Sequence, residues 1–307
     1  MAFTARPPGS RFQVVSIPSK RRTDRRTESL RVSDFTVRTL LNTATVTVRD
    51  VCCAGNCRHQ SAEECAGATE LVFPYRGVYA RHLGRDQAIA EANQVLFFNA
   101  GESYRVSHPV TGGDASLSLY ISEPVLRELA PKLLLREGAR LAFKRQRLRI
   151  DPRTQALVAL LRHGLRQGVA QPLEAESVAL TLVQRALGPR TSHASDAGIA
   201  PQRLADRVKL VLASDLSRRW TLGEIAAEVG GSPVYLTQIF RRVEGIPLYR
   251  YQLRLRLARA LTLLPQYDDL TALSLDLGFS SHSHFSAAFR EAYGRSPSEF
   301  RHAAMAH

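Results

Sequence analysis

Residues 221–241 read TLGEIAAEVGGSPVYLTQIFR, and residues 270–290 read LTALSLDLGFSSHSHFSAAFR. Each stretch has an apolar periodic segment, a break at glycine, a serine that can cap a helix, and a second apolar stripe. Two helices joined by a short glycine turn form the motif whose second helix enters the major groove of DNA. Because the pattern occurs twice, it favours a sequence-specific DNA-binding protein over a helical bundle with another role.

The spacing of apolar residues predicts a buried face for each helix of the first unit. Ile225 and Val229 fall on one face of a helix that ends at the glycine pair 230–231. Ser232 can cap the next helix, and Pro233 suits its first turn, where the missing N–H costs nothing. The residues that then point outward are Val234, Tyr235, Thr237, Gln238, Arg241 and Arg242.

The second unit repeats this arrangement with one extra turn residue. Ser281 can cap its second helix, in which Phe285 and Phe289 face inward. The outward side of that helix carries His282, Ser283, Ser286 and Ala287. A glycine followed closely by a proline comes after each unit, at 245–247 and 294–297, which supports an internal duplication. An amphipathic helix with a leucine seam is predicted between the units.

Charge is distributed unevenly along the 307 residues. The net charge of +14 and the isoelectric point near 10.3 favour a polyanionic partner such as double-stranded DNA. Residues 1–33 carry eight Lys/Arg against two acidic residues, whereas residues 201–307 carry fourteen against ten. We therefore expect a flexible basic arm at 1–33. Apolar runs are too short for a membrane span or a signal segment, which predicts a cytoplasmic protein.

The remaining chain divides by pattern, and the predicted fold class is α+β. Short alternating runs with turn residues predict an antiparallel sandwich or barrel up to about residue 122, as at 44–48 and 116–121. Residues 123–188 have a helical pattern, and the small polar residues at 188–200 read as a linker. The predicted domains are a sensor and dimerisation domain at 34–187 and an all-helical DNA-binding domain at 201–307.

Residues 203–302 resemble the DNA-binding region of AraC/XylS-type transcriptional regulators, most specifically over DLGFSSHSHFSAAFREAYGRSPSEFR (276–301). The resemblance implies seven helices, with two recognition helices held by the connecting helix. The base contacts that it implies are Pro233, Val234, Thr237 and Gln238 in the first unit and His282, Ser283, Ser286 and Ala287 in the second. The expected phosphate contacts are Arg218, Arg241, Arg242, Arg254 and Arg290. Many relatives carry Arg where this chain has Ala287, and Arg is the commonest reader of guanine, so the second helix is expected to lack that contact.

The stretches RGVYARHL (76–83) and NQVLFFNAGESYRVSHPVTGGD (93–114) resemble the cupin-like sensor domain of the same family. This resemblance implies control by a small-molecule effector, a homodimer formed through helices at 123–188, and RNA polymerase as a partner if the protein activates transcription. Candidate effector contacts, because sandwich mouths gather polar groups, are Tyr79, Arg81, His82, Tyr104 and His108. The alternative is that these are ordinary strand and loop residues.

All four cysteines lie in the segment VCCAGNCRHQSAEEC (51–65). Zinc prefers tetrahedral sulfur and nitrogen ligands, so Cys53, Cys57, His59 and Cys65 are a possible zinc set and the only cofactor site that the sequence suggests. An exposed and activated thiolate could instead act as a redox switch. The third interpretation is four unliganded small residues, since the paired C-x2-C of a zinc knuckle is absent. A thiol- or metal-responsive regulator is therefore the alternative to an organic effector.

Enzymatic functions find little support in the sequence. A cupin metalloenzyme fused to a DNA-binding tail would bring His82, Glu102 and His108 together, but the usual His-x-His pair is missing. A DNA-repair alkyltransfer sensor would need a Pro-Cys-His nucleophile motif, which does not occur. Neither a phosphate-binding glycine loop nor a Ser-His-Asp pattern is present. The prediction is that the chain is not an enzyme and has no catalytic residues.

Overall fold

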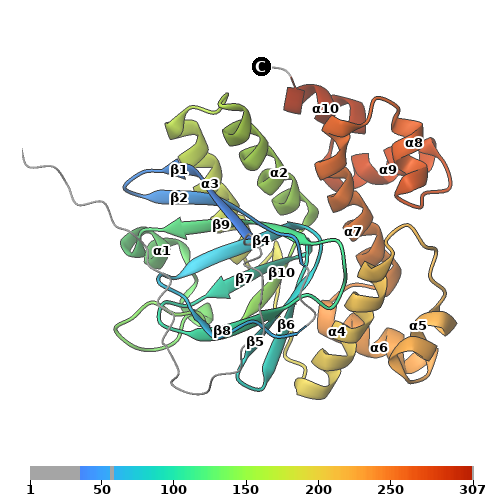
Figure 1. The fold of residues 1–307 in the computed structure, drawn as a ribbon, viewed down its shortest axis with the longest axis horizontal. Helices are drawn as coiled ribbons and strands as arrows, with labels where there is room; N and C mark the ends of the chain where they lie inside the picture. The colour runs from blue at the N-terminus through green and yellow to red at the C-terminus, as the bar shows by residue number, and fades with distance from the viewer. Residues whose placement is uncertain (1–34, 56–58, 306–307) are drawn as a thin grey trace, which may run out of the picture. The chain divides into compact units, whose positions relative to one another are not determined.

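The computed structural model describes residues 35–55 and 59–305. The predicted basic arm at 1–33 and Cys57 lie outside the described residues. Strands dominate the first part of the described chain and helices the last part, as the sequence predicts (Figure 1). None of the helices in the described ranges combines the length and apolarity that crossing a bilayer requires.

Two antiparallel sheets form the first part. The seven-stranded sheet consists, in spatial order, of β1 (Phe35–Asn42), β2 (Val46–Cys53), β9 (Asp114–Ile121), β4 (Glu70–Arg76), β7 (Gln94–Phe98), β10 (Arg147–Ile150) and β11 (Ser192–His193). The four-stranded sheet consists of β3 (Glu64–Cys65), β8 (Ser103–Ser107), β5 (Tyr79–Leu83) and β6 (Asp86–Ala90). The predicted sandwich of short strands is confirmed.

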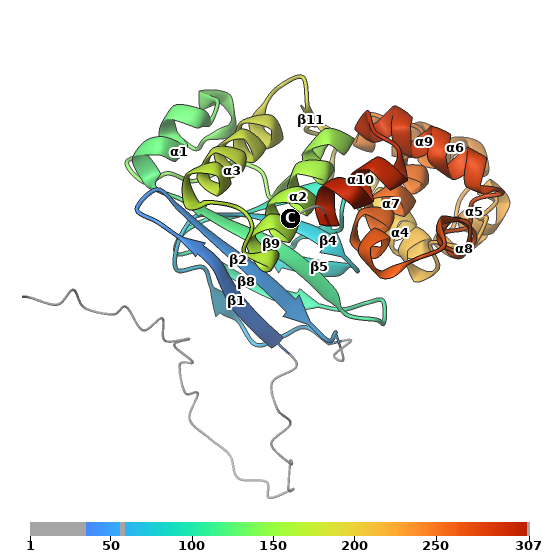
Figure 2. The ribbon, with the colours of Figure 1, turned by 90° about the horizontal axis from the view of Figure 1, so that it is seen from above.

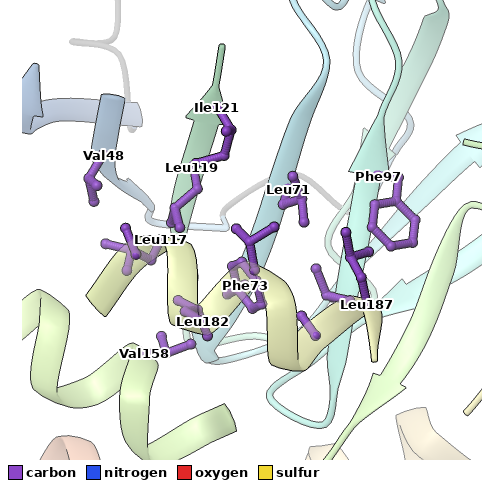
Figure 3. Packing of buried hydrophobic residues seen from close by; sticks show 14 of the residues in the cluster. Val48, Leu71, Phe73, Phe97, Leu117, Leu119, Ile121, Val158, Leu182 and Leu187 are labelled. Atoms are coloured by element: carbon purple, nitrogen blue, oxygen red, sulfur yellow. The ribbon is translucent and has the colours of Figure 1, made fainter. Parts of the chain in front are cut away.

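The alternation of side chains along the strands decides what each face of the seven-stranded sheet contacts. On β9, Leu117 and Leu119 belong to a large apolar cluster that also contains residues of the covering helices. Successive strand residues point to opposite faces, so Ser116 and Ser118 lie on the other side. Figure 3 shows Leu117, Leu119 and Phe73 packed near Leu182 of a covering helix. The hydrophobic core therefore lies on one face of this sheet, and the other face is partly polar.

Three helices lie on the core face of this sheet (Figure 2). They are α1 (Glu123–Leu129), α2 (Pro152–Gln167) and α3 (Pro172–Leu187), and the short 3-10 turn η1 (Lys132–Leu134) follows α1. The uniform helical prediction for 123–188 is wrong at β10, where Leu148 and Ile150 are buried and alternate with two arginines. This strand forms because β7 offers an open edge to pair with. Asp151 then caps α2 by accepting from the Thr154 N–H at 2.8 Å.

Seven α-helices form the last part, which confirms the number implied by the resemblance. They are α4 (Ile199–Ser214), α5 (Leu222–Val229), α6 (Pro233–Glu244), α7 (Leu248–Leu263), α8 (Leu270–Asp276), α9 (His282–Tyr293) and α10 (Pro297–Met305), with a 3-10 turn η2 (Leu264–Gln266) after α7. One apolar cluster joins α4, α5, α6 and the start of α7, and a second joins the end of α7 to α8, α9 and α10. Helix α7 thus belongs to both cores and connects the two helix-turn-helix units (Figure 1).

The part of the chain that contains the two sheets (the sheet part, described residues 35–55 and 59–193) contacts both helix-turn-helix units. Leu210 and Ala213 of α4 pack against Val78, Ala80 and Ile89 of the four-stranded sheet and its preceding turn. Helix α2 packs against the second unit through Ala156, Ala159 and Leu160. The described residues, 35–55 and 59–305, accordingly belong to one compact unit. The region expected to be a linker contains β11 and an ion pair from Asp196 to Arg145, and the proposed division at 188–200 stays a prediction.

Candidate nucleic-acid interface

Local capping fixes both ends of the first helix-turn-helix unit. Thr221 and Glu224 form a reciprocal capping box at the start of α5, in which each side chain accepts from the other residue's N–H. The helix ends at two glycines that both have positive φ angles, 72° at Gly230 and 137° at Gly231. Such values disfavour residues with a Cβ, which explains why glycine forms this turn. The Ser232 hydroxyl then accepts from the Tyr235 N–H at 3.2 Å and starts α6.

Helix α6 is amphipathic and buries one side against α4, α5 and α7. Leu236, Phe240 and Val243 are buried in the first helical core, and the Phe240 ring meets Tyr251 edge to face at 5.0 Å. The opposite side is open, with Val234 66% exposed and Gln238 also exposed. A helix held by one face and open on the other is what docking into a major groove requires.

Helix α9 has the same construction in the second unit. Ser281 accepts from the His284 N–H at 3.2 Å, and Gly294 ends the helix with φ 76°. Phe285 and Phe289 are fully buried and contact each other at 5.7 Å between ring centroids. Replacement of such a phenylalanine by alanine typically costs about 3–5 kcal/mol of folding free energy. The orientation of α9 is therefore fixed by its aromatic core.

The residues expected to contact bases lie on the open faces of these two helices. The exposed members are Pro233, Val234, Gln238, His282, Ser283 and Ala287, whereas Thr237 and Ser286 are half-buried. The Thr237 hydroxyl donates to the Val234 carbonyl at 2.8 Å within α6. Ser286 lies 3.2 Å from the His282 Nε2 atom, one turn earlier on α9. Their contacts to bases stay predictions.

The arginines predicted to contact phosphates are not equivalent. Arg241 and Arg242 in the last turn of α6 and Arg290 in that of α9 are exposed, and no carboxylate forms an ion pair with them within the described ranges. Arg218 pairs with Glu224 at 2.7 Å and stacks on Trp220. Arg254 is half-buried, and burial lowers the pKa of its guanidinium below the ordinary value. Arg241, Arg242 and Arg290 are therefore better suited than Arg254 to contact the phosphate groups of DNA.

Arg256 joins the two units, and the sequence analysis did not single it out. Its guanidinium donates to the carbonyls of Leu216 and Arg218, ahead of α5, at 2.7 and 2.8 Å. It also donates to the carbonyl of Gly278, in the turn of the second unit, at 3.1 Å. One side chain on α7 thus ties together backbone from both units. The sequence signal for Arg256 was its position on the helix that connects the two units. No local sequence pattern distinguishes a half-buried arginine at such a position from an exposed one.

A buried ionic network connects the first unit to the sheet part. Lys209 of α4 is fully buried and lies 2.6 Å from Glu244 of α6 and 3.5 Å from Asp206. Asp206 also pairs with Arg147 of β10 at 2.7 Å. Burial alone would raise the pKa of the Glu244 carboxyl, but the positive charges of Lys209 and Arg147 hold it below its ordinary value. Helix α6 is therefore attached to the sheet by buried charges.

The polar residues of this network extend to the seven-stranded sheet. The Tyr251 hydroxyl donates to Glu91, and Gln94 of β7 donates to Glu244 at 3.2 Å. Burial raises the pKa of the Glu91 carboxyl, although the charge of Lys209 opposes that rise. The sequence carried one signal of this arrangement, because Lys209 falls on the apolar stripe of its helix between Ala205 and Leu212.

The five expected effector contacts do not all come together. Arg81 is fully buried and stacks on Phe98 at 4.0 Å and on Tyr104 at 5.3 Å, so it bridges the two sheets. Tyr79 lies two residues away on the same strand face, and burial together with the charge of Asp114 raises its pKa. His82 points to the other face, where its Nε2 lies 2.8 Å from the Ser107 hydroxyl. His108 is buried beside Asp114, 2.9 Å between Nε2 and Oδ2.

The cysteine segment is spread over different surroundings. Cys52 points toward the helix side of the sheet, where its Sγ lies 3.7 Å from the Tyr75 hydroxyl. Cys65 is exposed on β3, and His59 is exposed as well. Within the described residues, the side chains that come close enough to share a metal ion are those of Cys53, His108 and Asp114. His59 and Cys65 do not belong to this group. Because Cys57 is not described, the predicted four-residue zinc set stays a prediction.

Comparisons with known proteins agree with the geometry of the two helical units. Residues 225–303 match the family described as a helix-turn-helix domain. The transcriptional activator RhaR of Klebsiella pneumoniae is 33% identical over 115 residues, which cover 36% of this chain and 41% of RhaR. The regulator GadX of Escherichia coli is 26% identical over 226 residues, 73% of this chain and 79% of GadX. A regulator structure from Chromobacterium violaceum, described as AraC-type, is 29% identical with a TM-score of 0.33 and covers 35% of this chain and 96% of that one.

The chain spans about two fifths of the length of RhaR and of the Msm operon regulatory protein of Streptococcus mutans. The names of these relatives are those of transcriptional regulators, which agrees with the prediction that the chain is not an enzyme. The match falls on the two units whose caps, cores and open faces are described above. The C-terminal part of the chain is thus similar, over residues 225–303, to a helix-turn-helix domain, and the relatives that it matches are named as transcriptional regulators.

Proposed function

We propose that the chain is a sequence-specific DNA-binding transcription regulator of the AraC/XylS type. The observation that carries the proposal is the pair of capped helices, α6 and α9, each buried on one face and open on the other. Arg241, Arg242 and Arg290 supply phosphate contacts, which give affinity without sequence preference. Side chains on the open faces supply the preference. Gln238 is placed to pair with adenine, since its amide both donates and accepts.

An effector that binds between the two sheets is the second part of the proposal. Arg81 donates to the Phe97 carbonyl at 2.7 Å and to Glu102 at 3.1 Å, whereas its buried Nε has no hydrogen-bond partner among the described residues. A buried donor without an acceptor is costly, and an acceptor group of a ligand would satisfy it. The rings of Phe98 and Tyr104 flank the guanidinium and fix its position. We infer that Tyr79, Arg81 and Tyr104 contact a small molecule with an acceptor group.

Regulation then follows from differential binding. An effector changes DNA binding only if it prefers one arrangement of the protein, and its site must therefore be coupled to the helical units. The packing of α4 against β5 and β6 supplies a physical connection. We propose a cytoplasmic homodimer, with a second copy on the helices at 123–188, where Leu133 and Leu173 are 71% and 76% exposed. RNA polymerase is a further partner if the protein activates transcription.

Selection from random DNA duplexes tests the DNA-binding proposal directly. The full chain should enrich a defined sequence, and a genome-wide binding map should place that sequence near promoters. The variant with Arg241→Glu and Arg290→Glu should lose affinity for all duplexes, because both changes repel phosphate. The matched control is Arg153→Glu on α2, an exposed arginine of the sheet part. If no sequence is enriched by a folded full chain, the proposal is wrong.

A further inference from the structure

Three glycines bring separate segments of the sheet part into backbone contact. A Cβ on Gly77 would lie 2.0 Å from the Gly113 carbonyl oxygen, and a Cβ on Gly113 would lie 2.5 Å from the Cys53 carbonyl oxygen. A Cβ on Gly55 would lie 2.8 Å from the Gly113 Cα. All three have φ between 66° and 69°, which favours glycine independently of the crowding. The end of β2, the turn before β5 and the start of β9 are therefore held together closely.

Three metal-ligating side chains meet at this contact. The Cys53 Sγ, a ring nitrogen of His108 and a carboxylate oxygen of Asp114 all lie within 4.8 Å of one another. His108 and Asp114 are 7% and 6% exposed, and Cys53 is half-buried. The Gly55 N–H donates to the Cys53 Sγ at 3.4 Å, which helps to hold the sulfur in place. The group therefore combines sulfur, nitrogen and oxygen donors in a sheltered place.

The donor set selects a class of metal ion. Thiolate and imidazole suit zinc and its transition-metal neighbours, whereas magnesium and calcium prefer oxygen alone. Tetrahedral zinc with bonds of about 2.0–2.3 Å places its ligand atoms roughly 3.3–3.8 Å apart. The separation of 2.9 Å between His108 and Asp114 would open by a few tenths of an ångström, and the three ligand atoms, which lie within 4.8 Å of one another, would close around the ion. Both are side-chain adjustments within a fixed backbone.

We propose that Cys53, His108 and Asp114 form a binding site for one zinc-like transition-metal ion, with the fourth position open to water or to a ligand. The proposal shares only Cys53 with the set expected from the sequence. The proposed site also differs from a cupin-type site at His82 and Glu102, because His82 points to another face and Glu102 pairs with Arg81 and Arg136. It does not depend on the proposed DNA binding, and it makes the sheet part a candidate metal sensor.

Cobalt titration of the full chain tests the site by spectroscopy. Protein stripped with a chelator and kept reduced should bind one equivalent of Co2+, with a thiolate-to-cobalt charge-transfer band in the near ultraviolet and visible bands of a tetrahedral ion. Zinc should displace both. Cys53→Ser should abolish the charge-transfer band, and His108→Asn and Asp114→Asn should each weaken Co2+ binding by about tenfold or more.

Two other cysteines provide matched controls. Cys52→Ser changes the neighbouring thiol, whose Sγ lies near Tyr75 instead, and Cys65→Ser changes an exposed thiol on β3. Both should keep the band and the affinity of the unchanged protein. The proposal is overturned if no band appears, if the band persists in Cys53→Ser, or if it disappears equally in Cys65→Ser.

A second measurement separates loss of the site from loss of the fold. Zinc should raise the melting temperature of the unchanged protein with increasing concentration, because an ion that binds only the folded chain stabilises it. Asp114→Asn keeps the size of the side chain, so this variant should fold and show no zinc-dependent rise. A rise of the same size in Asp114→Asn would contradict the assignment of that ligand.

Discussion

The backbone of Ser217 occupies the space that a side chain on Gly278 would need. A Cβ on Gly278 would lie 2.0 Å from the Ser217 carbonyl oxygen and 2.9 Å from its Cα. Ser217 precedes α5 of the first helix-turn-helix unit, and Gly278 forms the turn of the second. The two units therefore touch backbone to backbone, next to the Arg256 side chain that hydrogen-bonds to both.

We expect Gly278→Ala to destabilise the protein and to weaken DNA binding. The left-handed backbone at φ 78° alone costs a residue with a Cβ about 1–3 kcal/mol, and the overlap with Ser217 adds to it. Gly294→Ala is the matched control, because Gly294 has φ 76° but open space around the position of its Cβ. Urea unfolding of both variants gives the two costs. Equal losses would show that the contact with Ser217 contributes nothing.

Gln238→Ala should relax base preference at one position of the operator. If the amide pairs with adenine, its removal weakens specific binding by roughly 1–3 kcal/mol and leaves nonspecific binding unchanged. Affinities for the selected sequence and for its variants at each base measure the effect. Gln266→Ala removes an exposed glutamine outside α6 and α9 and should change nothing. A uniform loss on all duplexes would assign Gln238 to phosphate contact or to folding.

Lys209→Met should be strongly destabilising although the new side chain is apolar. It leaves Glu244 and Asp206 buried with one fewer positive charge, and breaking a buried ion pair in this way costs about 3–5 kcal/mol. Adding Glu244→Gln should recover part of the loss, since the two groups interact directly. Lys144→Met, at an exposed position near β10, should change the free energy of unfolding by less than about 0.5 kcal/mol. Denaturant unfolding measures all three, and additive losses would exclude the coupling.

The capping box at the start of α5 predicts that the free energy of unfolding depends on pH in the acidic range. Hydrogen bonds from the Thr221 N–H and hydroxyl, with Arg218 nearby, lower the pKa of Glu224 from 4.5 to about 2. A carboxyl whose pKa is depressed on folding stabilises the fold above its unfolded pKa, and the benefit is lost as pH falls through the folded value. The stability difference between the unchanged protein and Glu224→Gln should be constant above pH 4.5 and shrink toward pH 2. Glu228→Gln, which removes an exposed carboxyl of α5 outside the capping box, is the comparison variant.

Local signals account for what the sequence predicted well. Ser232 and Ser281 cap the helices that their positions suggested, and the glycines at 230, 231 and 278 form the expected turns. The alternation at 117–121 gave a strand because one side of it faces a covered core. These features depend on a few neighbouring residues, and a single sequence contains that information.

Features that depend on distant residues were not predictable in the same way. The strand β10 exists because β7 pairs with it, fifty residues away along the chain. The ligand group takes Cys53 from β2 and His108 from beyond β8, so the clustering of cysteines in the sequence pointed to different partners. Likewise, nothing local places Arg147 opposite Asp206. Such pairings are decided by the packing of the two sheets and the helices.

The buried charges between α4, α6 and the sheet set a condition for building chimeric regulators. A chimera that joins the sheet part of one relative to the helical part of another would divide this chain within 188–200. That division separates Asp206 from Arg147 and Glu244 from Gln94. A graft onto a foreign sheet would keep Lys209 beside both carboxylates but would remove Arg147 from Asp206 and Gln94 from Glu244. Successful exchange requires that the recipient also carry the arginine and the glutamine at β10 and β7. The parts of this chain are thus interchangeable only as matched sets.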